Sequence, residues 1–273
     1  MRGEFHIHTN YSDGVLSVDQ ILEFVKGKEE CISITDHDIL DGSIEAYNKS
    51  KYYDLECIVG VEVSSYFKGD SVHILGYFKN LDKIDSLKDT LHNLRNQRVK
   101  RLYLMREKLK ELFDIDLDVT ELLKVSTITR GSIAREIVKQ NTQYTIEYLF
   151  SNVIGNGCPA YIPAVKIDTQ KAIDLIHQAN GVAVLAHPTL LRSCNATDIV
   201  KMGIDGIEAI YPRNKDNEEL EFRKLARENN LFITAGSDFH YFGDKSHADL
   251  LTHFLYDDEL KIFKEKVMEE KWM

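Results

Sequence analysis

The sequence predicts an α/β protein in which parallel strands alternate with helices, interrupted by a helical insertion. Short apolar segments recur along the chain, and most of them end in a histidine or an acidic residue. Between most of them lie segments with apolar residues at three- and four-residue spacing, the period of a helix. A long charged stretch in the middle of the chain has the helical pattern and no strand-like run.

Seven apolar segments are the expected strands. They are Glu4–His8, Cys31–His37, Glu56–Glu62, Val72–Tyr77, Gly181–His187, Gly206–Tyr211 and Leu231–Asp238. The helical pattern between them occupies Val18–Lys28, Thr169–Asn180 and Glu218–Asn230. The second of these helices has clear start and stop signals, because it begins beside an Asp-Thr pair and ends at Asn-Gly. Such alternation is typical of parallel sheets covered by helices.

The insertion begins with the helical pattern of Ile84–Phe113. Further helices are expected at Val119–Lys124, Ser132–Gln140 and Thr145–Asn152, before a strong turn signal at Gly155–Pro159. We therefore expect residues 81–160 to form a helical insertion and residues 1–80 and 161–273 to form the α/β domain together.

The composition is that of a globular protein with an acidic surface. Of 273 residues 43% are hydrophobic, and 44 acidic against 34 basic side chains give a formal charge of -10. Such a surface repels phosphate backbones, so we expect no non-specific binding to nucleic-acid duplexes. No apolar run approaches the roughly 20 residues that span a bilayer. The N-terminus has no apolar signal-peptide core, so we expect neither a membrane segment nor export.

The four cysteines are far apart and form no CxxC pair; they are Cys31, Cys57, Cys158 and Cys194. This spacing indicates neither a disulfide framework nor a thiolate zinc knuckle. We interpret them as free thiols in a reducing compartment, and hence expect a cytoplasmic protein.

Imidazole and carboxylate groups gather at the ends of the expected strands. His6 and His8 are two residues apart, so their side chains point to the same face of a strand and can bind one metal ion. Asp238 and His240 share a face in the same way, and Asp13 follows the first strand after a short polar turn. Further candidates beside strand ends are Asp36, His37, Glu62, His73 and His187.

The carboxyl ends of parallel strands meet at one edge, so we expect these side chains to converge on one cleft. A lone histidine at a strand end is more often a core or surface residue than a ligand. Here six of the ten histidines and several carboxylates stand at strand ends, and burying them without partners is costly. Their joint placement predicts a metal centre.

The donor set contains imidazole and carboxylate groups but no thiolate, which suits Zn²⁺, Mn²⁺ or Fe²⁺. Nine candidate ligands exceed the four of a single tetrahedral ion, so we expect two or three ions. Ions about 3.5 to 4 Å apart activate water and bind an oxyanion, an arrangement used for phosphoester hydrolysis.

The motifs HIHTNYSDG, ITDHD, GVEVS, HILGY, AHP and GSDFH resemble, in order and spacing, those of the polymerase and histidinol phosphatase (PHP) superfamily. The pattern RxxRxxRxxxMxxKL from Arg95, with ITRGSIA and GCPAYIP, resembles the insertion of PHP phosphoesterases that act on nucleotides. The resemblance implies a distorted (β/α)7 barrel with a trinuclear metal centre.

The resemblance also implies a ligand set. His6, His8, Glu62 and Asp238 would hold one ion, Glu62 would bridge to a second held by His73 and His187, and Asp13, His37 and His240 would hold the third. Two histidines that the family often carries are absent, one at Ser132 and one near Pro212. These departures leave the substrate more open than the metal chemistry.

We expect hydrolysis of a terminal phosphomonoester by a metal-bound hydroxide, with attack in line with the leaving alcohol. The expected substrate is a nucleotide, such as a nucleoside 3′,5′-bisphosphate or AMP, or a short oligoribonucleotide. The alternatives are a histidinol-phosphate phosphatase and a catalytically inert metal-binding module. The residues expected to act in catalysis are Asp13, Asp36, His37 and His240. Asp36 would either orient a liganding imidazole or cap the turn that follows it.

A phosphate also needs positive side chains, which an acidic protein must concentrate locally. The candidates are Arg98, Arg101, Arg130, Arg135 and Arg192. For the first two, an exposed helix face with ion pairs is the stronger interpretation. Arg130 and Arg135 are favoured, because they lie in the motif that resembles the substrate lid of the family. Tyr11 and Tyr211 are expected either to stack on a base or to pack at the rim. The remaining histidines, at positions 92, 177, 247 and 253, have no partnered motif and are expected to be surface residues.

Overall fold

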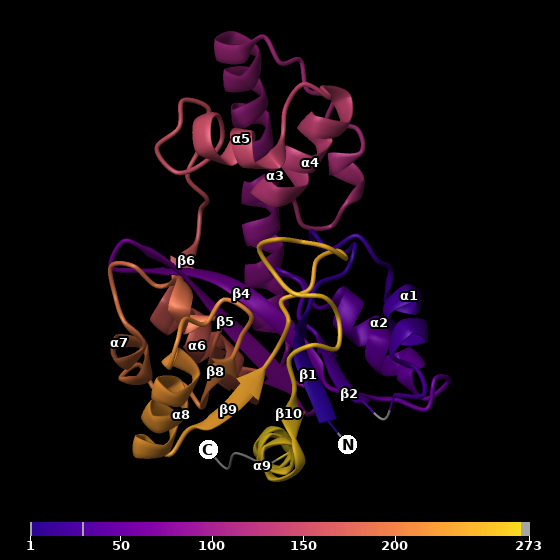
Figure 1. Ribbon diagram of the computed structural model, residues 1–273, viewed down its shortest axis with the longest axis vertical. Coiled ribbons are helices and arrows are strands. Elements are labelled where there is room, and N and C mark those ends of the chain that lie inside the picture. The colour runs from indigo at the N-terminus through magenta and orange to yellow at the C-terminus, as the bar shows by residue number, and fades with distance from the viewer. Residues whose placement is uncertain (1, 29, 269–273) are drawn as a thin grey trace. The chain divides into compact units, whose positions relative to one another are not determined.

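Strand β1 (Arg2–Ile7) begins the first of two units into which the chain divides (Figure 1). The computed structural model describes residues 2–28 and 30–268. The first unit comprises residues 1–90 and 166–273, and the second comprises residues 91–165.

The first sheet has the strand order β10-β1-β2-β3. Strand β1 pairs in parallel with β2 (Glu30–Ile34), which pairs in parallel with β3 (Glu56–Cys57), while β10 (Leu255–Tyr256) pairs antiparallel with β1. Helices α1 (Val18–Val25) and α2 (Asp41–Ser50) connect these strands. Ser17 and Gln20 form a capping box that starts α1, whose buried residues are Val18, Ile21, Leu22 and Val25.

The second sheet is mixed, with the order β6-β4-β5-β7-β8-β9. Strands β7 (Gly181–Leu185), β8 (Gly206–Ile210) and β9 (Phe232–Ala235) are parallel, and β6 (Ile167–Asp168) is parallel to β4 (Val59–Phe67). Strand β5 (Asp70–Phe78) runs antiparallel to both of its neighbours, which departs from the expected parallel arrangement. The reason is local, because only Lys68 and Gly69 separate β4 from β5, too few residues for a crossover.

Two isolated backbone bridges join the ends of the two sheets. Ile7 pairs with Phe239, just beyond β9, and His37, just beyond β2, pairs with Glu62 of β4. Seven strands therefore follow one another around the first unit: β1, β2, β4, β5, β7, β8 and β9. Within the described ranges the hydrogen-bonded ladders remain two sheets and do not form one closed sheet.

The remaining helices of the first unit pack on these strands. Helix α6 (Thr169–Gln178) lies on β4, β5 and β7, and α8 (Glu218–Glu228) lies on β8 and β9. Two shorter helices, η2 (Pro188–Leu190) and α7 (Ala196–Val200), follow β7. Phe263 of α9 (Asp257–Met268) packs on Phe5 and on Phe232, the first residue of β9. Helix α9 thus covers the amino end of β9, which leaves its carboxyl end for polar residues.

The second unit contains helices and no strand. The long helix α3 (Asp85–Phe113) runs into it from the first unit, and η1 (Leu122–Lys124), α4 (Arg130–Gln140) and α5 (Ile146–Asn152) follow. It has a hydrophobic core of its own, in which Leu109, Ile133 and Leu149 are fully buried or nearly so. No helix in the described part of the chain is both long and apolar enough to cross a membrane.

Candidate metal centre

Four buried side chains from β1, β4 and β9, or from the residues directly after these strands, meet at one point of the first unit. His6 lies in β1 and His8 follows it, while Asp238 follows the adjacent strand β9. Asp238 Oδ1 lies 3.4 Å from His6 Nε2 and 3.1 Å from His8 Nε2. Glu62 of β4 brings its Oε2 atom to 3.4 and 3.3 Å from the same two nitrogens.

These spacings are those of ligands around one metal ion. Two donors that are each about 2.1 Å from a tetrahedral ion lie about 3.4 Å from each other. The four side chains are already at that separation, and each offers one donor atom within 4.8 Å of the others. They can therefore hold one divalent ion.

Glu62 also faces three further imidazoles. Its Oε1 atom lies 2.6 Å from His73 Nδ1 and 3.0 Å from His187 Nε2, and its Oε2 atom lies 2.9 Å from His37 Nδ1. His73 lies on β5, next to β4, and His187 follows β7. One buried carboxylate is thus shared between two groups of imidazoles.

A second group is built around Asp13, in the turn after β1. Its Oδ1 atom lies 3.1 Å from His240 Nε2, and its Oδ2 atom lies 4.0 Å from His37 Nε2. His8, Asp13, His37 and His240 offer donor atoms within 4.8 Å of one another. The structure thus brings together all nine side chains that the sequence predicts as ligands; that they hold ions stays a prediction.

Several donor atoms in this cluster lack hydrogen bonds. Among the described residues, His6 Nε2, His8 Nε2, His37 Nδ1 and Glu62 Oε2 are buried without a hydrogen-bond partner. Leaving such atoms unsatisfied is costly, and they belong to the predicted ligands. The donor set therefore fits divalent metal ions.

The cluster is strongly coupled electrostatically. Burial raises the pKa of the Glu62 carboxyl group, but the imidazoles of His37, His73 and His6 hold it well below its ordinary value. Burial lowers the pKa of His8, but Asp238 and Glu62 raise it to about 10. For His73 burial outweighs Glu62, and the pKa falls to about 4. The carboxylates are thus held ionised, as metal ligands must be.

Glu208 of β8 is a buried carboxylate that sequence reasoning missed. Its Oε1 atom lies 2.9 Å from His6 Nδ1, and its Oε2 atom accepts a hydrogen bond of 2.7 Å from the backbone N–H of His187. A carboxylate behind a ligating imidazole fixes the ring and raises its basicity. The signal was present in the sequence, since a glutamate interrupts the apolar strand GIEAI.

Asp36 holds the turn after β1. Its carboxylate accepts hydrogen bonds from the Thr9 backbone N–H (2.7 Å), the Thr9 hydroxyl (2.6 Å) and the Ser12 hydroxyl (2.5 Å). Ser12 Oγ in turn lies 3.4 Å from His8 Nδ1. Asp36 therefore reaches a liganding imidazole through Ser12 and fixes the loop that carries Asp13.

Two side chains make contacts with the predicted ligands that the sequence did not predict. The buried Tyr211 donates its hydroxyl to Asp238 Oδ2 at 3.1 Å, where stacking on a base or rim packing was expected. His247 was expected to be a surface residue, but its ring stacks on His240 with centroids 4.3 Å apart. Tyr211 meets Asp238 because β8 pairs with β9, and His247 reaches His240 through the loop after β9.

Three of the predicted substrate-binding arginines form a cluster inside the second unit. Arg101 is 7% exposed, and its Nε donates to Ile162 O at 2.7 Å. Arg130 lies over the rings of Phe150 and Tyr161. Burial, together with repulsion by Arg130 and Arg98, lowers the pKa of Arg101 to about 10. Among the described residues, the hydrogen bonds of Arg101 and Arg130 go to the Ile162 carbonyl and to Asn156 Oδ1, and neither arginine has a carboxylate partner.

The other two predicted arginines lie elsewhere. Arg135 is half-buried in α4, and Arg192 is exposed in the loop before α7. The backbone N–H groups of Arg192, Ser193 and Cys194 all donate to Asp70 Oδ2, at 2.9, 2.6 and 2.8 Å, which fixes this loop.

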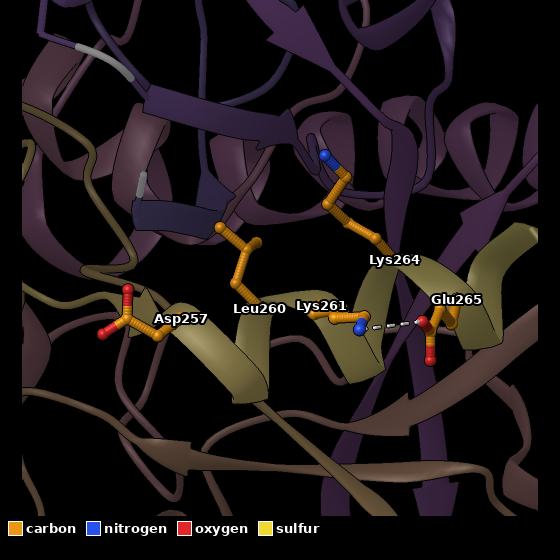
Figure 2. A pocket seen from close by; sticks show the side chains of 5 residues that line it. All are labelled: Asp257, Leu260, Lys261, Lys264 and Glu265. Carbon is orange, nitrogen blue, oxygen red and sulfur yellow. Dashed lines mark ion pairs between the residues drawn. The ribbon is translucent and has the colours of Figure 1, made fainter.

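A separate hollow of about 370 Å³ lies along α9. Figure 2 shows its lining residues, Asp257, Leu260, Lys261, Lys264 and Glu265, with Lys261 paired to Glu265. It contains none of the clustered imidazoles or carboxylates, so it is not part of the candidate metal centre.

The family model of the PHP domain matches residues 4–155. A 5'-3' exoribonuclease of Haemophilus influenzae is 30% identical over 87% of this chain and 89% of its own length. A 3',5'-nucleoside bisphosphate phosphatase of Chromobacterium violaceum is 26% identical over 88% of each chain.

Two solved structures are similar over most of the chain. A protein of Bifidobacterium adolescentis, assigned as a metal-dependent phosphoesterase, superimposes with a TM-score of 0.85 at 24% identity, covering 98% of this chain and 96% of that one. An amidohydrolase of Chromobacterium violaceum with bound sulfate superimposes with a TM-score of 0.76 at 25% identity, covering 89% of each.

Proposed function

Because the chain belongs to the PHP domain family and is thereby a metal-dependent phosphoesterase, we propose that it hydrolyses a terminal phosphomonoester of a nucleotide or a short oligoribonucleotide. The observation that carries the proposal is the convergence of nine donors, four of which have buried donor atoms without hydrogen-bond partners among the described residues. The names of two relatives, an exoribonuclease and a nucleoside bisphosphate phosphatase, support RNA ends and nucleotides as substrates.

We assign two to three divalent ions, Mn²⁺, Zn²⁺ or Fe²⁺, to this centre. His6, His8, Glu62 and Asp238 would hold the first, Glu62 with His73 and His187 the second, and Asp13 with His37 and His240 the third. When bound, such ions lower the pKa of water and neutralise charge on phosphoryl oxygens.

Residues around the centre orient and position the predicted ligands. Glu208 orients the His6 ring so that Nε2 faces Glu62 and Asp238. Asp36 fixes the turn that carries Asp13, and so acts in catalysis through position. His37, with its side chain 13% exposed, is more open to solvent than His6 or His8 and would meet an entering phosphate.

The arginine cluster would recognise the phosphates of the substrate. Arg98, Arg101 and Arg130 concentrate positive charge in a protein whose formal charge is -10. One guanidinium group can donate two parallel hydrogen bonds to two oxygens of a phosphate, which favours a phosphate ligand for this cluster. We assign Arg135 and Arg192 to the same task and residues 81–160 to the role of a substrate lid.

The seven strands joined by the Ile7–Phe239 and His37–Glu62 bridges would form the distorted (β/α)7 barrel of the family. The protein would work in the cytoplasm, and its buried free cysteines, Cys31 and Cys57, are consistent with a reducing compartment.

Phosphate release from a panel of substrates tests the proposal. The panel contains adenosine 3′,5′-bisphosphate, AMP, histidinol phosphate and a 5′-phosphorylated oligoribonucleotide, each with added Mn²⁺. We expect release from the nucleotides or the oligoribonucleotide. Release from histidinol phosphate alone would contradict the assigned substrate class, and release from none in the metal-loaded protein would favour an inert metal-binding module.

A further inference from the structure

His247 lies beside the candidate metal centre, on the loop that follows β9. Its Nδ1 atom is 2.8 Å from Asp244 Oδ2, and its Nε2 atom is 3.5 Å from Asp238 Oδ2. The ring stacks on that of His240, with 24° between the planes, and the side chain is 24% exposed. The imidazole is therefore positioned by Asp244, Asp238 and His240, and the side chain remains partly accessible to solvent.

The environment of His247 repeats that of His6, a predicted ligand. His6 has a buried carboxylate, Glu208, 2.9 Å from Nδ1, and its Nε2 faces Asp238 Oδ1 at 3.4 Å. His247 has the carboxylate of Asp244, only 7% exposed, at its Nδ1, and its Nε2 faces the other oxygen of Asp238. Metal-binding histidines almost always donate their second ring N–H to such a partner.

The distance to Asp238 also fits a ligand better than a hydrogen bond. At 3.5 Å the nitrogen and the oxygen are farther apart than in an ordinary N–H···O bond, which is 2.7–3.2 Å long. Two ligands of one tetrahedral ion are separated by about 3.4 Å. Asp238, His240 and His247 each offer a donor atom within 4.8 Å of the other two.

We propose that His247 is a tenth ligand of the centre, and that its Nε2 binds a divalent cation together with the Oδ2 atom of Asp238. The inference rests on the proposed function, because it requires that the centre binds ions. It assigns the second oxygen of Asp238 to metal binding and gives Asp244 the task of orienting His247, as Glu208 orients His6.

Calorimetric titration of the chelator-treated protein with Mn²⁺, with elemental analysis of the loaded protein, tests this. In His247→Asn we expect one ion fewer per chain, or one binding step weakened at least 10-fold, while the other steps keep their affinity. His253→Asn, the same substitution six residues further along, is the matched control and should bind like the parent. Unchanged stoichiometry and affinity in His247→Asn would overturn the assignment.

Tyr211→Phe tests whether His247 binds the ion itself or only positions Asp238. Tyr211 also contacts Asp238 Oδ2, and the variant removes that hydrogen bond. Equal weakening in Tyr211→Phe and His247→Asn would mean that His247 acts through Asp238, and would overturn the ligand role. Should His247→Asn lose its cooperative unfolding, Asp244→Asn replaces it, with weakening of the same step supporting the proposal and parent-like binding contradicting it. A parent protein that binds no ion would instead overturn the proposed function.

Discussion

A single carboxylate, Glu62, shows how burial and charge shape the centre. Fully buried, it faces His37, His73 and His187 within 3.0 Å, and further imidazoles beyond them. A buried carboxylate is tolerated only when it is paired, and here its partners are donors that bind metals themselves. The sequence motifs identified this residue, because GVE ends an apolar run. Glu208 had a signal that was not used, a glutamate within the apolar strand GIEAI, whereas His247 became visible only through the tertiary contacts of the loop after β9.

Glu208 is expected to act by orienting its neighbours. Glu208→Gln removes the charge behind His6 and should weaken Mn²⁺ binding by about 10- to 100-fold without unfolding the protein. Calorimetric titration measures the affinity, and Glu221→Gln, an exposed change on α8, is the control. Parent-like affinity in Glu208→Gln would show that the contact does not support the metal ligands.

Asp70 gives a pH-dependent prediction. Burial raises its pKa, but the N–H groups of Cys194, Arg192 and Ser193 lower it from 3.8 to about 2. The stabilisation from a lowered carboxyl pKa is complete above pH 3.8 and disappears as the pH falls towards 2. Asp70→Asn should therefore lower the free energy of unfolding by up to about 2 kcal/mol at pH 7, with the difference vanishing near pH 2.

Urea-induced unfolding of the metal-free protein at a series of pH values measures this effect. The exposed Asp216→Asn is its control and should change little at any pH. If the free energy of unfolding of Asp70→Asn is still lower than that of the parent below pH 2, the variant has lost packing and not a charge interaction.

The sequence predicted most of the helices and strands, and local contacts explain the elements whose bounds differ from the prediction. Helix α4 begins at Arg130, two residues before the expected start, because Thr129 caps it. Ser132, at a position where the family often has histidine, completes this capping box through its hydroxyl. The β4–β5 hairpin was missed because the expected strand ended at Glu62, whereas β4 continues to Phe67 and leaves a two-residue turn.

The cap of α4 can be tested directly. Thr129→Ala removes the acceptor for the Ser132 N–H and should destabilise the protein by about 1 kcal/mol. Thr142→Ala, at an exposed position beyond the same helix, is the control. Chemical unfolding followed by circular dichroism measures both, and equal stability of the two variants would contradict the cap.

Strands that are far apart in the sequence contribute side chains to one site. Ligands at positions 6 and 238 meet because β1 lies beside β9, although 232 residues separate them in the sequence. Periodicity alone predicted that strand ends would converge, but it could not predict which strands are neighbours, since strand order depends on long-range pairing. The second unit comprises residues 91–165, whereas the lack of strand-like runs predicts an insertion over residues 81–160.

Metal binding should stabilise the folded protein as a whole. A ligand that binds only the folded state adds about 4 kcal/mol at 1,000 times its dissociation constant, which corresponds to roughly 10 °C in melting temperature. Differential scanning calorimetry with excess Mn²⁺ and with a chelator measures the difference. Identical melting temperatures in the two conditions would mean that the buried donors do not bind the ion.

The most direct measurement is phosphate release by the chelator-treated protein before and after Mn²⁺ is restored. Adenosine 3′,5′-bisphosphate and a 5′-phosphorylated oligoribonucleotide are the substrates, and the parent is compared with Glu62→Gln and the exposed control Glu23→Gln. We predict release only after reloading, retained in Glu23→Gln and reduced more than about 100-fold in Glu62→Gln. Equal release with and without metal, or full activity in Glu62→Gln, would contradict a metal-dependent phosphoesterase centred on this carboxylate.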